Sequence, residues 1–355
     1  MDSLSNISNI FNISNISNIS DISNTSNIPN IPNMKDIYIA RPYFTHIILS
    51  GGGIKGICYL GIMRYLYIEK LCDNIRYIYG TSIGAYFSLI ISLKIPLEFI
   101  ENDIMEVLRY FETKEELAIT QKNIHKMFIS NGLYELRWIC EPIIKYIKQQ
   151  YHQDDLTFIE LIKKTGINLN IHCTNVNNGN YKIFNAETTP NVSVIDAVTA
   201  SMSIPFLFQP VQIEDEYYVD GEISSYSKSI FLENQKNLDH SNVLNVVLVN
   251  TAIIEIPKLE NGSDISFIEY LLRILLIVVK KLFEMYKKES NQIDEESNIN
   301  NLYIKNFTSN SIINFKIDND EIKVDITNDD FENLILLGFI EITNFMNKKY
   351  GKSHI

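Results

Sequence analysis

Two stretches decide the fold of this chain: THIILSGGGIKG at residues 45–56 and YIYGTSIG at residues 77–84. Each starts with a short apolar run typical of a buried strand, turns at glycines, and leads into a helical pattern, at 54–70 and 83–91. Strand, turn and helix repeated twice predict an α/β fold with a mostly parallel sheet flanked by helices. Further downstream the same patterns predict strands at 168–173, 182–184, 217–219 and 243–249, and helices over much of 97–164 and at 193–201.

The two ends of the chain differ from this central pattern. Residues 1–35 carry an Ile at nearly every third position among Ser and Asn, a period that fits neither a helix nor a strand. They predict a disordered leader, with a sticky segment that stacks its Ile side chains as the alternative. We expect a main domain over 43–250. Residues 251–355 are expected to form an α+β annex packed on it, with helices at 265–288 and 331–346 and a strand at 312–317.

The composition excludes several classes of protein. A net charge of −12, from 31 Lys and Arg against 43 Asp and Glu, argues against a nucleic-acid-binding protein. The four cysteines lie far apart without a C-x-x-C pair, which predicts reduced thiols and no zinc site. We see no signal peptide and no apolar run of the roughly 20 residues that would span a bilayer. We therefore expect a protein that is cytoplasmic or peripheral to a membrane.

The pentapeptide GTSIG, residues 80–84, lies between a predicted strand and a predicted helix. A G-x-S-x-G in that context indicates a nucleophile elbow, a sharp turn that exposes a serine hydroxyl. Gly80 and Gly84 would leave room for the turn, and the amino end of the helix would favour a developing oxyanion near Ser82. The alternative is an ordinary glycine-rich turn whose serine caps the helix.

The hexapeptide GGGIKG, residues 51–56, lies in the same kind of position. Its bare amides suit an anion, which favours either a dinucleotide-binding loop or an oxyanion hole. The dinucleotide motif requires an acidic residue about 20 positions on, at the end of the second strand. Here that strand ends in Gly80-Thr81-Ser82, and Asp73 precedes it. An oxyanion hole built from Gly51, Gly52, Gly53 and Gly56 is therefore the better interpretation.

The third motif, Asp220-Gly221, follows the short strand at 217–219. Alone it is typical of a hairpin turn. If it lies beside Ser82, Asp220 could act as a base, provided that burial raises its pKa above the value of about 4 of a free Asp. A Ser-His-Asp hydrolase would instead need a histidine after Asp220. The only candidates are His240, in a polar stretch, and His354, next to the end of the chain.

These three motifs, in this order, resemble those of the patatin-like phospholipases, as does ASMSIPFLFQPV at residues 200–211. The resemblance covers roughly residues 43–250. It implies a modified α/β-hydrolase-type sheet and a Ser82–Asp220 dyad that needs neither a histidine, a metal nor a cofactor. It also implies oxyanion amides around Gly52 and Gly53. Lys55, Gly80, Gly84 and Gly221 complete the motifs.

The expected activity is that of a phospholipase A-type lipid acyl hydrolase, with a lipid ester as substrate and a membrane or lipid surface as partner. One position departs from the family pattern, because Glu222 replaces a small residue after Asp220-Gly221. Two alternatives stay open: a non-catalytic or weakly active lipid-binding relative, and an α/β-hydrolase esterase that uses His240. The amphipathic 265–288 segment, which carries several Lys and Arg, could lie on a membrane or pack on the sheet.

Overall fold

A computed structural model describes residues 42–113, 124–224, 231–233, 239–249, 299–305, 314–318, 321–325 and 328–351, with single or paired residues between 267 and 281. All of them belong to one compact unit, Arg41–Ile355. The predicted leader, 1–35, and His354 lie outside the described residues, as does most of the predicted helix at 265–288. The domain boundaries at 35 and 250 stay predictions.

The main sheet has the order β10-β9-β1-β2-β4-β8-β7, and β5 also pairs with β4. Five strands run parallel: β1 (His46–Leu49), β2 (Tyr77–Thr81), β4 (Asn168–Asn175), β9 (Val243–Leu248) and β10 (Asn300–Ile304). Three run antiparallel to their neighbours: β5 (Tyr181–Phe184), β7 (Val211–Ile213) and β8 (Glu216–Asp220). The prediction of a mostly parallel α/β sheet is confirmed.

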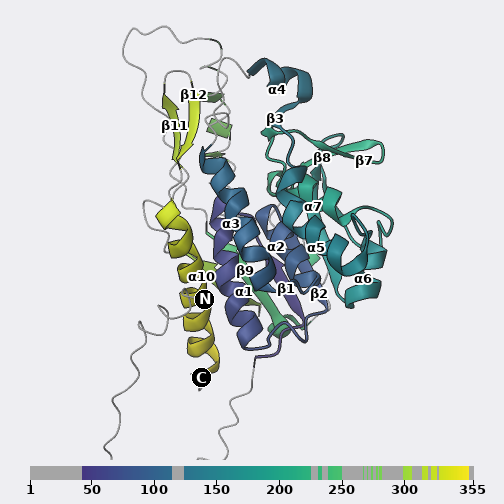
Figure 1. The fold of residues 1–355 in the computed structure, drawn as a ribbon, viewed down its shortest axis with the longest axis vertical. Helices are drawn as coiled ribbons and strands as arrows, with labels where there is room; N and C mark the ends of the chain where they lie inside the picture. The colour runs from purple at the N-terminus through teal and green to yellow at the C-terminus, as the bar shows by residue number, and fades with distance from the viewer. Residues whose placement is uncertain are drawn as a thin grey trace, which may run out of the picture. The chain divides into compact units, whose positions relative to one another are not determined.

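Most of the described α-helices lie between strands in the sequence, and the last one follows them all: α1 (Cys58–Ile68), α2 (Ile83–Ser92), α3 (Leu97–Thr113), α4 (Ile124–Ser130), α5 (Glu141–Tyr151), α6 (Phe158–Thr165), α7 (Val194–Met202) and α10 (Asn328–Tyr350). Figure 1 shows α10, α1 and α3 side by side over the sheet. The helix predicted at 54–70 begins as a 3-10 turn, η1 (Gly53–Ile57), before it becomes α1. Short 3-10 turns are common at helix amino ends.

The parallel strands are buried on both faces, which explains their continuous apolar runs. On one face, Ile47 and Ile78 join a large core that includes residues of α1, α2 and α7. On the other face, Ile48 and Tyr79 pack against Phe231 in a smaller cluster. Each fully buried side chain of this size contributes roughly 1.5–3 kcal/mol, so the sheet is a rigid platform for the turns that follow its strands.

The C-terminal region extends the main sheet. Its strand β10 pairs in parallel with β9, and α10 packs along α1. The two helices approach closely at glycines: a Cβ on Gly61 would lie 1.9 Å from the carbonyl oxygen of Ile335, and one on Gly338 would lie 2.0 Å from that of Cys58. The helix predicted at 331–346 is thus confirmed as part of α10. Strand β10, in contrast, was not predicted.

The described residues also form two small sheets. In the first, β3 (Gly132–Tyr134) pairs in parallel with β6 (Phe206–Phe208), and in the second, β11 (Asn314–Asp318) pairs with β12 (Glu321–Asp325). The strand predicted at 312–317 corresponds to β11. The sequence predicted neither β3, which lies in the 97–164 range where mostly helices were expected, nor its partner β6.

Candidate active site

Ser82 occupies the turn between β2 and α2, at the carboxyl end of the parallel strands. Its backbone has φ 54° and ψ −131°, a conformation that L-residues rarely adopt and that costs about 1–3 kcal/mol. The flanking glycines are sterically required. A Cβ on Gly84 would lie 2.3 Å from the carbonyl oxygen of Leu49, and one on Gly80 would lie 2.5 Å from the Ser88 hydroxyl. The turn therefore has the tight, strained geometry expected of a nucleophile elbow.

Strand β4 brings the end of β8 to this turn. His172 pairs with Thr81 of β2 and also with β5, while Cys173 pairs with β5 and also with Asp220 of β8. Because a strand residue has one neighbour on each side, β2 and β8 must lie on the same side of β4, end to end. The carboxyl ends of β2 and β8 therefore meet, and the residues that end them become neighbours.

The two sequence-predicted catalytic residues are in direct contact. The Ser82 hydroxyl donates a hydrogen bond of 2.6 Å to Asp220 Oδ2, across 138 positions of sequence. The other oxygen, Oδ1, accepts the backbone N–H of Glu222 at 2.9 Å. Burial raises the pKa of Asp220 to about 6, although both hydrogen bonds act in the opposite direction. The carboxylate is thus a stronger base than a free Asp and is still ionised at neutral pH.

Helix α7 fixes both members of the pair from one side. The backbone N–H of Ser82 donates to Ser201 Oγ at 2.9 Å, and the Ser201 hydroxyl donates to the carbonyl of His172 at 2.6 Å. The N–H of Asp220 donates to the carbonyl of Ser203, the residue that caps this helix. These hydrogen bonds fix the position of the elbow relative to the Asp220 turn.

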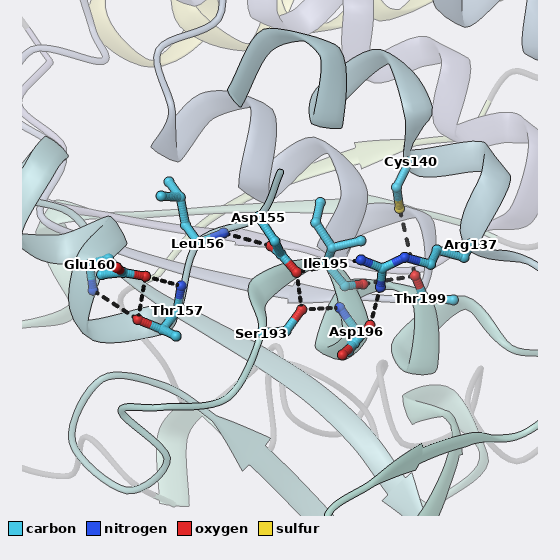
Figure 2. Close-up of polar contacts among 10 residues, drawn as sticks. All are labelled: Arg137, Cys140, Asp155, Leu156, Thr157, Glu160, Ser193, Ile195, Asp196 and Thr199. Carbon is cyan, nitrogen blue, oxygen red and sulfur yellow. Dashed lines mark hydrogen bonds and ion pairs between the residues drawn. The ribbon is translucent and has the colours of Figure 1, made fainter. Parts of the chain in front are cut away.

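The amino end of α7 is anchored as firmly (Figure 2). Ser193 caps the helix by accepting the N–H of Asp196 at 2.9 Å, and its own hydroxyl donates to Asp155. Arg137 forms ion pairs with both Asp155 and Asp196. Since a satisfied cap stabilises a helix by about 1 kcal/mol, this network resists displacement of α7 and of the serines at its other end.

The glycine loop lies against the elbow. A Cβ on Gly56 would lie 2.2 Å from the side chain of Ile83, the residue after Ser82. A Cβ on Gly84 would lie 2.5 Å from the carbonyl oxygen of Ser50, which precedes the loop. Gly52 and Gly53 open the η1 turn, and Gly53 has φ 56°. The loop is therefore placed where its amides can serve a carbonyl bound at Ser82.

The remaining loop residues have distinct surroundings. The N–H of Gly51 donates to the Glu222 carboxylate, so this amide already has an acceptor. A Cβ on Gly52 would lie 2.8 Å from the side chain of Leu248. Lys55 is buried, and burial lowers the pKa of its ammonium to about 8. Gly221 is needed because a Cβ there would lie 2.4 Å from the carbonyl oxygen of His172.

Histidines do not complete a triad in the described part of the chain. The rings of His240 and Phe231 have their centroids 5.9 Å apart, and His240 also lies near His46. His46 pairs with Tyr77, four residues before Thr81, so His240 lies at the opposite end of the strands from Ser82. At about 3.3 Å per residue, that separation exceeds roughly 10 Å. His240 therefore cannot serve as the base of Ser82.

His172 is the histidine nearest the elbow, and the sequence did not single it out. Its Nδ1 lies 3.2 Å from Thr81 Oγ1, and its buried Nε2 has no hydrogen-bond partner among the described residues. Burial lowers the pKa of this imidazole to about 3, so it is neutral. Its position in an alternating strand offered no signal. Ser201 and Ser203 lie in the ASMSIP stretch, which resembles the family, but nothing in the sequence indicated that they would form hydrogen bonds at the site.

The fold and the site define a serine hydrolase-like α/β protein, and comparison with known families identifies which one. Residues 47–226 match the family model described as patatin-like phospholipase, about half of the chain. The protein belongs to the patatin-like phospholipase family, a family of lipid hydrolases, as the three ordered motifs predicted.

Individual relatives are distant. The chain is 26% identical over 197 residues to the uncharacterized protein R571 of Acanthamoeba polyphaga mimivirus, covering 54% of this chain and 63% of that protein. It is 27% identical over 188 residues to the probable lipid hydrolase 463L of Invertebrate iridescent virus 6, covering 51% and 60%. Triacylglycerol lipase 4 of Saccharomyces cerevisiae is 26% identical over 219 residues, covering 55% and 23%. The chain thus spans less than two thirds of the length of these relatives.

Two solved structures are similar to this chain at low identity. VipD from Legionella pneumophila superimposes with a TM-score of 0.47 at 15% identity, covering 86% of this chain and 67% of VipD. ExoU from Pseudomonas aeruginosa, in complex with SpcU, gives a TM-score of 0.36 at 17% identity, covering 70% and 53%. Within the described residues, no helix is both long and apolar enough to cross a membrane.

Proposed function

We propose that this chain hydrolyses carboxylic ester bonds of lipids, with Ser82 as nucleophile and Asp220 as base. The observation that carries the proposal is the 2.6 Å hydrogen bond from the Ser82 hydroxyl to a buried carboxylate. The strained elbow, the adjacent glycine loop and the raised pKa of Asp220 support it. These are the parts that a serine acyl hydrolase requires: an activated hydroxyl, a base and oxyanion donors.

The reaction would proceed in two steps. In the first, Asp220 accepts the proton of Ser82 as its oxygen attacks the ester carbonyl, and amides of Gly52 and Gly53 stabilise the oxyanion. The C–O bond then breaks, and the departing alcohol takes the proton from Asp220. In the second, Asp220 removes a proton from water, which attacks the acyl-serine, and the fatty acid leaves as Ser82 regains its proton. No metal ion is needed to balance either step.

The proposed substrate is an ester in a membrane or lipid droplet, cleaved in the manner of a phospholipase A. Exposed apolar side chains near the site support contact with such a surface. Phe128 and Ile129 of α4 are 64% and 79% exposed, and Ile204 and Phe206 are 41% and 48% exposed. Ile204 directly follows Ser203, whose carbonyl accepts the N–H of Asp220, so Ile204 lies close to the catalytic pair. Helix α4 contacts β3, which pairs with β6, the strand that contains Phe206.

Labelling with a fluorophosphonate tests the nucleophile. The probe should modify Ser82, and Ser82→Ala should abolish labelling. On phosphatidylcholine and on triacylglycerol substrates, Ser82→Ala and Asp220→Asn should each lower kcat by on the order of a thousandfold. His240→Ala should leave kcat unchanged, because that side chain lies at the other end of the sheet. Near-normal turnover by either dyad variant would contradict the proposal.

Vesicle flotation tests the lipid surface. Replacing Phe128 and Ile129 together by Ser should weaken binding to vesicles, because it removes apolar area worth roughly 1–3 kcal/mol per side chain. Ile68→Ser is the matched control. Ile68 is 64% exposed but ends α1, at the opposite end of the sheet from Ser82. Equal loss of vesicle binding in both variants would contradict the proposal that Phe128 and Ile129 contact the lipid surface.

A lipid-binding relative that is non-catalytic or weakly active is the second candidate, and Glu222 is the observation that favours it. Its carboxylate accepts the N–H of Gly51, the first residue of the glycine loop, and its backbone N–H donates to the proposed base, Asp220. The rate of fluorophosphonate labelling separates the candidates, since a non-catalytic protein would form no serine adduct and a weakly active one would form it slowly.

A further inference from the structure

Glu222 connects the two halves of the proposed site. Its backbone N–H donates to Asp220 Oδ1 at 2.9 Å, and its carboxylate accepts the N–H of Gly51. A Cβ on Gly51 would lie 2.5 Å from the carboxyl carbon of Glu222 and 2.6 and 2.8 Å from its two oxygens. The side chain therefore lies directly on the first residue of the glycine loop. A small residue at position 222 could not make this contact.

Within the part of the chain that the structure describes, the charged and titratable groups around this contact come from three elements. Asp220 precedes it on the same turn. Lys55 lies on η1, four residues after Gly51, and is buried. From β4, His172 lies against Gly221, and Cys173 pairs with Asp220. His172 is neutral, and burial raises the pKa of the Cys173 thiol well above its usual value. Among the described residues, two carboxyl groups therefore share a site in which Lys55 is the cation further along the loop.

We propose that Glu222 is a positioning residue for the glycine loop: protonated, it holds the loop ready for the oxyanion, and ionised, it opposes that oxyanion. The inference rests on the proposed function. Two carboxyl groups that lie close together, one buried (Asp220) and one half-buried (Glu222), disfavour double ionisation, since each charge raises the free energy of the other. A second negative charge a few ångström from a developing oxyanion would slow the chemical step by on the order of a hundredfold.

In this proposal Asp220 loses its proton before Glu222 does. Burial raises the pKa of Asp220 to about 6, and burial together with the charge of Asp220 raises the pKa of Glu222 to about 8. Between these values Asp220 is ionised and can accept a proton, while Glu222 is neutral and its carbonyl oxygen can still accept the Gly51 N–H. Below this window the base is protonated. Above it, both groups are charged. Activity should therefore rise through about pH 6 and fall through about pH 8.

Glu222→Gln separates charge from contact, because the amide keeps an acceptor for Gly51 but cannot ionise. We expect kcat on a short-chain nitrophenyl ester, measured from about pH 5 to about pH 10, to drop a few-fold at neutral pH and to lose its alkaline fall. The ratio of variant to wild-type kcat should then rise about tenfold for each pH unit above about 8. Glu222→Ala removes the contact as well and should lower kcat at every pH, with partial recovery in Glu222→Gln.

Glu187→Gln, at an exposed position before α7, is the matched control and should keep the wild-type pH profile. Thermal unfolding of each variant at two pH values shows that it is folded. If kcat of Glu222→Gln falls at alkaline pH as steeply as that of the wild type, the inference is overturned. Identical kcat values for the Gln and Ala variants would also overturn it. Failure of the proposed function gives a different result, since the wild-type protein would then show neither turnover nor serine labelling at any pH.

Discussion

Substituting Gly84 by Ala offers a direct test of how the elbow is built. A Cβ at this position would lie 2.3 Å from the carbonyl oxygen of Leu49 and 2.5 Å from that of Ser50. Relief to an ordinary contact of about 3.2 Å requires a shift of roughly 1 Å between the elbow and the start of the glycine loop. The same substitution raises helix propensity by up to about 1 kcal/mol, so intrinsic propensity alone would predict a stabilised protein.

The clash should dominate because Ser50 cannot easily move. Its N–H donates to Val246 at 3.1 Å, its carbonyl accepts the Tyr59 hydroxyl at 2.6 Å, and its hydroxyl accepts the N–H of Leu248 at 3.0 Å. The displacement must therefore fall on Ser82. A misplacement of about 1 Å of a reacting group costs about a hundredfold in rate, and overpacking costs about 1–3 kcal/mol of stability.

The assay compares kcat, fluorophosphonate labelling rate and melting temperature of the wild type, Gly84→Ala and a control. Gly179→Ala is suitable as the control: the glycine has φ 75°, so Ala is strained there, but a Cβ would meet nothing within 4 Å. We expect a loss of kcat of about a hundredfold in Gly84→Ala and unchanged kcat in Gly179→Ala. A Gly84→Ala protein that keeps wild-type kcat and gains stability would refute the steric argument.

Three further predictions concern the base, the elbow and the core. With the pKa of Asp220 raised to about 6, kcat/KM should fall about tenfold for each pH unit below about 6, as protonation removes the acceptor; a profile that falls only near about pH 4 would contradict the effect of burial. Ser201→Ala leaves the N–H of Ser82 without its acceptor and should lower kcat about tenfold and stability by about 1–3 kcal/mol, measured by kinetics and denaturant unfolding. Gly61→Ala should lower the free energy of unfolding by about 1–3 kcal/mol through the α1–α10 contact, yet keep kcat below the transition temperature; an unchanged denaturation midpoint would count against that packing.

Local patterns in the sequence predicted much of the fold. The buried strands β1, β2, β4 and β9 and the helices α2, α7 and α10 have strong periodicity or apolar runs that do not depend on distant residues. Short or polar strands were missed, among them β6, β7, β10 and β12. Strand β10 reads NNLYI and follows a polar stretch, so only its pairing with β9 makes it a strand. The propensity of such segments is too weak to compete with their tertiary context.

The sequence by itself determined the chemistry available: a serine in an elbow motif, a loop of bare glycines and an aspartate after a strand, in the order of one family. Only the tertiary structure decided that these groups meet. Ser82 and Asp220 are brought together because β2 and β8 line the same side of β4, a result of strand pairing that no local pattern encodes. The contact of Glu222 with Gly51 is decided in the same way, because a side chain finds its partner only after the backbone has closed a long loop between them.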